Sequence, residues 1–93
     1  MSYRRALERL ATLPSHEIAA ACSGTRIPSL ITQCVDELME LTALADEAML
    51  DDRYMEFVLY TQEISAWSET VQMLRIMASD STLTARAAMG EIA

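Results

Sequence analysis

Two runs of apolar residues at helical spacing dominate the sequence. The first run alternates steps of three and four residues through Ile31, Cys34, Leu38, Leu41, Ala45 and Ala48. The second run alternates in the same way through Phe57, Tyr60, Ile64, Trp67, Val71, Leu74 and Ala78. Because such an alternation places every member on one side of an α-helix, the sequence predicts two long amphipathic helices.

The two runs are separated by a slip in helical phase at a pair of aspartates. Continuing the first run would place an apolar residue at position 52, where the sequence has an aspartate. Aspartate is a poor helix former and a good N-cap, so we expect a tight turn in which Asp51 or Asp52 caps the second helix. The pattern predicts helices over residues 29–50 and 52–78 that pair as an antiparallel hairpin.

Glycine and proline mark the ends of the shorter predicted elements. We expect one helix over residues 3–13 and another over residues 16–22, with Gly24 as the left-handed C-terminal cap of the second. Pro28 suits the first turn of the long helix that follows. A short C-terminal helix is expected over residues 82–89. β-Branched residues are sparse, so the predicted fold class is all-α, a small helical bundle built on the hairpin.

Length and composition indicate one folded domain over residues 1–93. Hydrophobic residues make up 52% of the chain and charged residues 23%, which is typical of globular proteins rather than disordered ones. A chain of this size buries only about 60–65% of the surface that its unfolded form exposes. A partner or a second copy would therefore add useful stability.

The second long helix carries a further apolar side, which we call the second apolar face. Its residues are Met55, Val58, Leu59, Met73, Ile76 and Met77. A single neighbouring helix cannot bury both sides of this helix. Either the short helices of the bundle cover the second apolar face, or it is left for a partner helix or a second copy. Methionine is adaptable and suits surfaces that accept a helix.

The net charge of −7 is concentrated in the middle of the chain. Residues 36–69 hold ten acids and one arginine, a net charge of −9, whereas residues 1–35 hold four arginines and two acids, a net charge of +2. This balance disfavours direct binding to nucleic acid or to anionic lipid. Five carboxylates near the turn form what we call the acidic tip: Asp46, Glu47, Asp51, Asp52 and Glu56. They are a solvated end of the hairpin or a docking surface for a basic partner.

The residues that usually carry chemistry are too few to predict an enzyme. His16, Cys22 and Cys34 match no zinc spacing, and no histidine accompanies the carboxylates of the long helices, so we expect no metal and no cofactor. Cys22 and His16 are six residues apart, which places them on different sides of a helix. We expect two reduced thiols, no membrane span and a cytoplasmic protein.

These patterns predict a small acidic protein that acts by protein–protein contact, as an adaptor, a chaperone or an inhibitor. It would bury the second apolar face against a partner helix or a second copy, with a homodimer as one outcome. The alternative is an acidic mimic of nucleic acid that inhibits a DNA- or RNA-handling enzyme. Salt distinguishes the two, because binding through charge weakens steeply with ionic strength and apolar burial does not.

Overall fold

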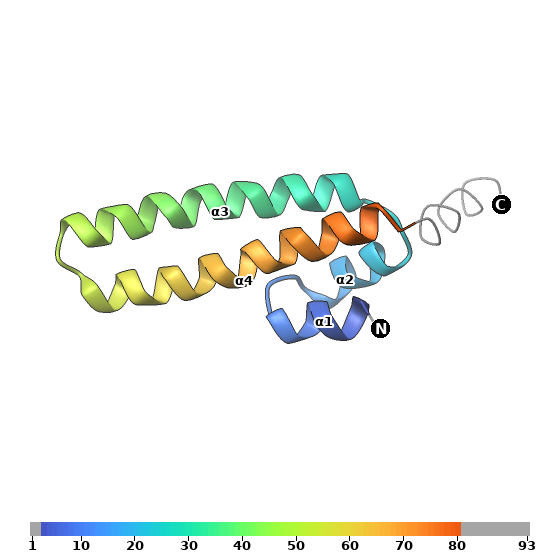
Figure 1. The fold of residues 1–93 in the computed structure, drawn as a ribbon, viewed down its shortest axis with the longest axis horizontal. Coiled ribbons are helices and arrows are strands. Elements are labelled where there is room, and N and C mark those ends of the chain that lie inside the picture. The colour runs from blue at the N-terminus through green and yellow to red at the C-terminus, as the bar shows by residue number, and fades with distance from the viewer. Residues whose placement is uncertain (1–2, 81–93) are drawn as a thin grey trace.

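The computed structural model describes residues 3–80, and every regular element there is an α-helix (Figure 1). Two long helices form an antiparallel hairpin, and two short helices pack at its open end, where the chain enters α3 and leaves α4. In chain order the helices are α1 (Tyr3–Leu10), α2 (Ser15–Cys22), α3 (Ile27–Leu50) and α4 (Tyr54–Ala78). The predicted all-α hairpin fold is confirmed. The predicted helix over residues 82–89 lies outside the described residues.

The turn between the long helices is where the phase slip predicts it, but its two aspartates have another role. Asp52 adopts a left-handed backbone conformation with φ of 57°. The Asp52 N–H donates to the Met49 carbonyl at 3.3 Å, and the Arg53 N–H donates to the Ala48 carbonyl at 2.9 Å. This pair of bonds is a Schellman motif, which satisfies the last carbonyls of α3. The expectation that Asp51 or Asp52 caps α4 is wrong: Arg53 is its N-cap, without a side-chain hydrogen bond.

The short helices end at sites that the sequence marks only in part. Gly24 has φ of 80° and closes α2 with a second Schellman motif, as expected, and Pro28 lies in the first turn of α3. By contrast, α1 ends at Leu10 instead of residue 13, because Ala11 turns the chain with φ of 56°. The N-terminal helix is therefore shorter than its apolar pattern predicts.

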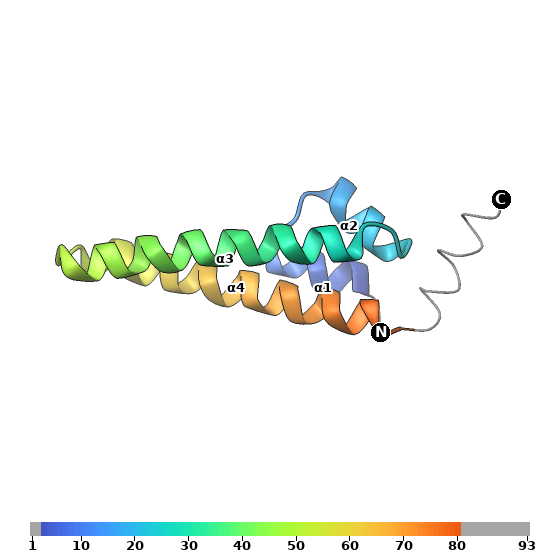
Figure 2. The same cartoon turned by 90° about the horizontal axis from the view of Figure 1, so that it is seen from above.

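The hydrophobic core lies at the open end of the hairpin, where all four helices meet (Figure 2). Its buried members are Leu7, Leu13, Ile18, Ala21, Ile27, Leu30, Cys34, Val71, Leu74 and Met77. Toward the turn, residues 3–80 form a structure two helices thick, and we call residues 39–66 the distal half of the hairpin. There α3 buries Leu41, Ala45 and Ala48, but α4 buries none of its residues from 54 to 66.

Two hydrogen bonds fix α1 and the segment after it against α4. The Thr70 hydroxyl is fully buried and donates to the Ala66 carbonyl at 2.9 Å, while the Thr12 hydroxyl lies 2.6 Å from it. Since Thr70 has used its proton, Thr12 donates to Thr70. At the other end of α1, the Tyr3 hydroxyl donates to Asp80 Oδ2 at 2.7 Å. These bonds determine how far along α4 the N-terminal helix reaches.

Candidate protein-binding surface

One stripe of α4 passes from the core to the open surface, and we call it the α4 seam. Its residues follow each other at helical spacing: Met55, Leu59, Glu63, Ala66, Thr70, Met73 and Met77. At the open end of the hairpin, Thr70 and Met77 are 0% exposed. In the distal half, Leu59 is 57% exposed and Met55 is 73% exposed. The same side of one helix is therefore core at one end and solvent-accessible surface at the other.

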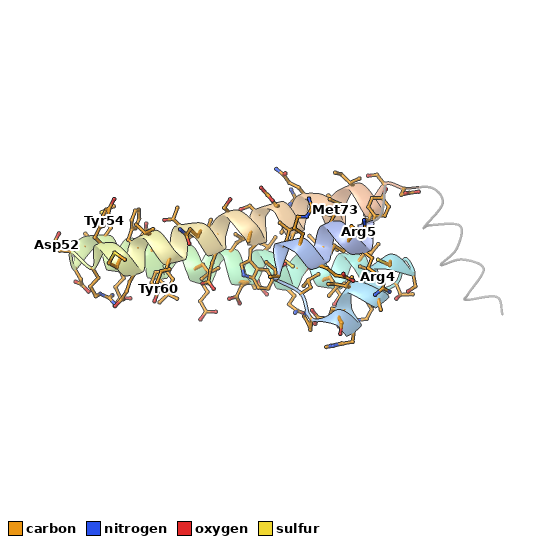
Figure 3. The ribbon with its side chains drawn as sticks, turned by 90° about the horizontal axis from the view of Figure 1, so that it is seen from below. Arg4, Arg5, Asp52, Tyr54, Tyr60 and Met73 are labelled. Carbon is orange, nitrogen blue, oxygen red and sulfur yellow. The ribbon has the colours of Figure 1, made fainter. Side chains whose placement is uncertain are left out.

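The end of α1 explains this change along the α4 seam. Helix α1 runs along α4 toward the turn and stops beside the middle of α4, so that Tyr60 and Tyr54 lie beyond its end (Figure 3). Leu7 of α1 is fully buried in the same cluster as Met77. Beyond Ala11 the chain turns away toward α2, and no described element covers α4 from there to Arg53 on this side.

The structure divides the predicted second apolar face. Met77 is a core residue with no exposed surface, so its place on a binding face is corrected: α1 and α2 cover it. Met73 is half-buried against the core, and Val58 is half-buried in the distal half. The three exposed members of the second apolar face are Met55, Leu59 and Ile76. Of these, Met55 and Leu59 belong to the open part of the α4 seam.

Other large apolar side chains are exposed in the distal half of the hairpin, and the sequence pattern did not single them out. They are Met39, Met49, Leu50 and Tyr54. Met49, Leu50 and Tyr54 flank the turn itself, so they continue the apolar surface around Met55. Their exposure cannot be recognised in the sequence, because the same apolar residues would be buried if a third helix packed on this half of the hairpin.

A groove opens where α1 ends against α4. Its volume is about 450 Å³, and its lining includes Leu10, Thr12, Leu59, Tyr60, Glu63 and Trp67. Trp67 is half-buried, packs against the core and also lines the groove. The groove combines aromatic walls with one exposed carboxylate, that of Glu63. Such a combination suits a side chain with an apolar stem and a cationic head.

A second groove lies beside α1, nearer the open end of the hairpin. Its volume is about 340 Å³, and its lining includes Ala6, Arg9, Glu69, Met73 and Ile76. It contains the remaining exposed residue of the second apolar face, Ile76. Ile76 and Leu59 therefore line different grooves, and the predicted face is not one continuous surface.

The acidic tip is exposed, and an arginine within it offsets part of its charge. All five of its carboxylates are at the surface. Arg53 lies 3.5 Å from Asp51 and forms a close ion pair with Glu56. With five acids and one arginine, the net charge of this end is −4. The tip thus remains acidic, next to the exposed apolar side chains of the turn.

The Cys34 thiol is not placed to act as a nucleophile. Cys34 is 0% exposed, and burial, with the nearby carboxylates of Glu17 and Glu37, raises the pKa of its thiol to about 11. Glu17 itself is nearly buried and accepts hydrogen bonds from Gln33 Nε2 at 3.2 and 3.3 Å. A thiolate is the reactive form, so Cys34 is inert near neutral pH.

A metal site and a membrane span are both absent from residues 3–80. No group of three or more His, Cys, Asp or Glu side chains is placed to hold a metal ion there. None of the four helices has the length and apolar character that crossing a membrane requires.

Comparison with known proteins identifies a family. The family model of the TY-Chap C-terminal domain matches residues 1–81, which is most of the 93-residue chain. No curated protein matches the chain, and no solved structure matches it. The matched range includes all four helices and both grooves. The chain therefore belongs to the TY-Chap C-terminal domain family, a family of chaperone-type domains.

Proposed function

We propose that this chain is a chaperone-like interaction domain that covers an apolar segment of a partner protein with the open part of the α4 seam. The observation that carries the proposal is the contrast along that seam, which is fully buried at Met77 and mostly exposed at Leu59 and Met55. The apolar residues that form the core at one end of the seam can form an interface with a partner at the other end, where they are exposed. Membership of the chaperone-type family supports a protein partner.

The expected binding energy is modest and needs the groove as well as the seam. Full burial of a leucine or methionine side chain contributes about 1.5–3 kcal/mol. Leu59 and Met55 are already partly covered, so together they contribute only part of that range. Association costs at least about 4 kcal/mol, so the groove beside Trp67 must also be filled. This balance favours a reversible complex, which suits a chaperone that must release its partner.

Adaptability is a second requirement for a chaperone, and the side chains around the turn meet it. Met49 and Met55 are exposed. Methionine has several rotatable bonds and a polarizable sulfur, so it can repack around segments of different shape. We expect partners that share an apolar character rather than one fixed sequence.

The alternative function, an acidic mimic of nucleic acid, has less support. Arg53 forms ion pairs with two carboxylates of the acidic tip, and exposed Leu50 and Tyr54 lie beside the tip. A mimic would need an uninterrupted array of negative charge to reproduce a phosphate backbone. The charge of the tip is better suited to orienting an encounter with a basic protein surface.

The test is affinity capture from native cell extract with two matched variants. Met55→Glu combined with Leu59→Glu places two charges in the open part of the α4 seam. The control is Met39→Glu, which also charges an exposed methionine of the distal half but lies outside the α4 seam and both grooves. Circular dichroism of all proteins establishes that they fold.

We expect the double variant to lose the proteins that the wild-type chain captures, while Met39→Glu keeps them. Proteins identified in this way are then purified and their affinities remeasured by calorimetry at low and high salt. Capture that survives the double variant contradicts the proposal. Affinity that depends on the acidic tip and falls steeply with salt would instead support the mimic.

A further inference from the structure

We propose that the open part of the α4 seam takes a basic amphipathic helix of the partner protein, lying along α4 in line with α1. This inference rests on the function proposed above and specifies the chemistry of the partner. Three observations carry it: the length of the open seam, the character of the helix that already covers the rest, and the unpaired carboxylate in the groove.

The open part of the α4 seam has the length of a short helix. From Ala66 to Met55 is eleven residues of α4, about 16 Å at about 1.5 Å per residue. A partner helix of about three turns would cover this distance. Because α1 ends at one side of the groove, a helix in line with it would continue the packing of α1 on α4 as far as the turn (Figure 3).

The chain itself shows which kind of helix packs on this seam. Helix α1 has the sequence YRRALERL, with Leu7 buried against the core and Leu10 at the groove. Its polar side carries three arginines and one glutamate, a net charge of +2. The covered part of the α4 seam is therefore occupied by a short, basic, amphipathic helix. The open part continues the same stripe with more acidic surroundings.

Charge complementarity specifies the side chain that would enter the groove. Glu63 is exposed and forms no ion pair within the described part of the chain. A lysine or arginine could pack its stem against Leu59 and place its cation beside Glu63, with the Tyr60 ring nearby. Arg53, the cation at this end, is already paired with Asp51 and Glu56. A partner helix with acidic residues would meet repulsion here.

The probe is a fluorescein-labelled peptide of fourteen residues with leucines at helical spacing and lysine or arginine elsewhere. A control peptide keeps the leucines and replaces every cation with glutamate. Fluorescence anisotropy measures both affinities for the wild-type chain, for Glu63→Lys and for Glu40→Lys. Both variants replace a glutamate with a lysine, so they change the net charge equally. Glu40 is exposed on α3 and lines neither groove, so only Glu63→Lys changes the proposed binding site.

We expect the basic peptide to bind and the acidic peptide not to bind. Glu63→Lys should lower the affinity for the basic peptide by about tenfold or more, because a charge pair that is desolvated in the complex is replaced by repulsion. Glu40→Lys should lower this affinity by less than about threefold, since only the long-range electrostatic attraction changes. Equal affinity for both peptides, or equal effects of the two variants, would overturn the inference.

Two further outcomes separate this inference from the proposed function. If Met55→Glu with Leu59→Glu abolishes capture of cellular partners while neither peptide binds, the surface is functional and the basic helix is wrong. If light scattering finds a dimer that this double variant dissociates, a second copy is the occupant and the inference is again overturned. If the double variant changes neither capture nor peptide binding, both proposals fail.

Discussion

Asp52 determines how the hairpin turns, and it does so through its backbone. Its left-handed conformation, with φ of 57°, allows the Schellman motif that ends α3. Aspartate tolerates this conformation better than most residues, but glycine adopts it without steric cost. Asp51, directly before it, has φ of −93° and needs no such freedom. Two identical neighbours in the sequence thus have different conformational requirements.

We therefore predict different effects of glycine at these two positions. Asp52→Gly should raise the free energy of unfolding by about 0.5–1 kcal/mol, because it removes the cost of the left-handed conformation. Asp51→Gly should leave it unchanged or lower it, since only the entropy of the unfolded chain rises. Urea denaturation of both variants measures the difference. An Asp52→Gly protein that is no more stable than Asp51→Gly would contradict this account of the turn.

Helix α4 is one element in two environments. Among the described helices, α4 packs against α1, α2 and α3 near its C-terminal end and against α3 near its N-terminal end. The periodicity of the α4 seam is the same throughout, but the energetic role of its residues is not. Where α1 lies on the seam, the side chains stabilise the fold, and where α1 is absent they are free to contact a partner.

Truncating equivalent positions of the α4 seam should show this division. Met77→Ala should lower the free energy of unfolding by about 2–5 kcal/mol, because it opens a cavity in the core. Leu59→Ala should lower the free energy of unfolding by less than about 1 kcal/mol, because the Leu59 side chain is mostly exposed. Thermal or urea denaturation provides the comparison. Similar losses at both positions would mean that α1 covers the distal half as well.

At the scale of the molecule, stability is concentrated at the open end of the hairpin. All ten residues of the main buried cluster lie there, contributed by the four helices and, at Leu13, by the connection between α1 and α2. The distal half depends on contacts between two helices and on three buried residues of α3. A binding surface made from the less stable half can adjust to a partner without disturbing the core.

Native-state hydrogen exchange should follow this gradient. Amides of α3 near Cys34 and of α4 near Leu74 should exchange most slowly, because opening them requires global unfolding. Amides near Leu44 and Leu59 should exchange faster, through local opening of the hairpin. Addition of the basic helical peptide should slow exchange around Leu59 more than around Leu74. Uniform protection along α3 and α4 would contradict the gradient, and NMR spectroscopy resolves the individual amides.

The sequence by itself determined the hairpin, because local signals specify it. The slip in apolar phase places the turn at Asp51 and Asp52, and Gly24 and Pro28 mark where α2 ends and α3 begins. It did not determine the role of the aspartates. The same residue type favours an N-cap and tolerates a left-handed C-terminal position, and only the geometry of the turn selects between them.

The tertiary structure alone decided which part of the α4 seam is core and which is surface. Met55 and Met77 have the same residue type and share a stripe, so periodicity treats them alike. Met77 is buried because α1 and α2 reach it, and Met55 is exposed because α1 ends before it. That end depends on Ala11, a helix-favouring residue held in a left-handed conformation next to the bond between Thr12 and Thr70. The end of α1 thus depends on a contact between segments that are distant in the sequence, and a local sequence pattern cannot predict such a contact.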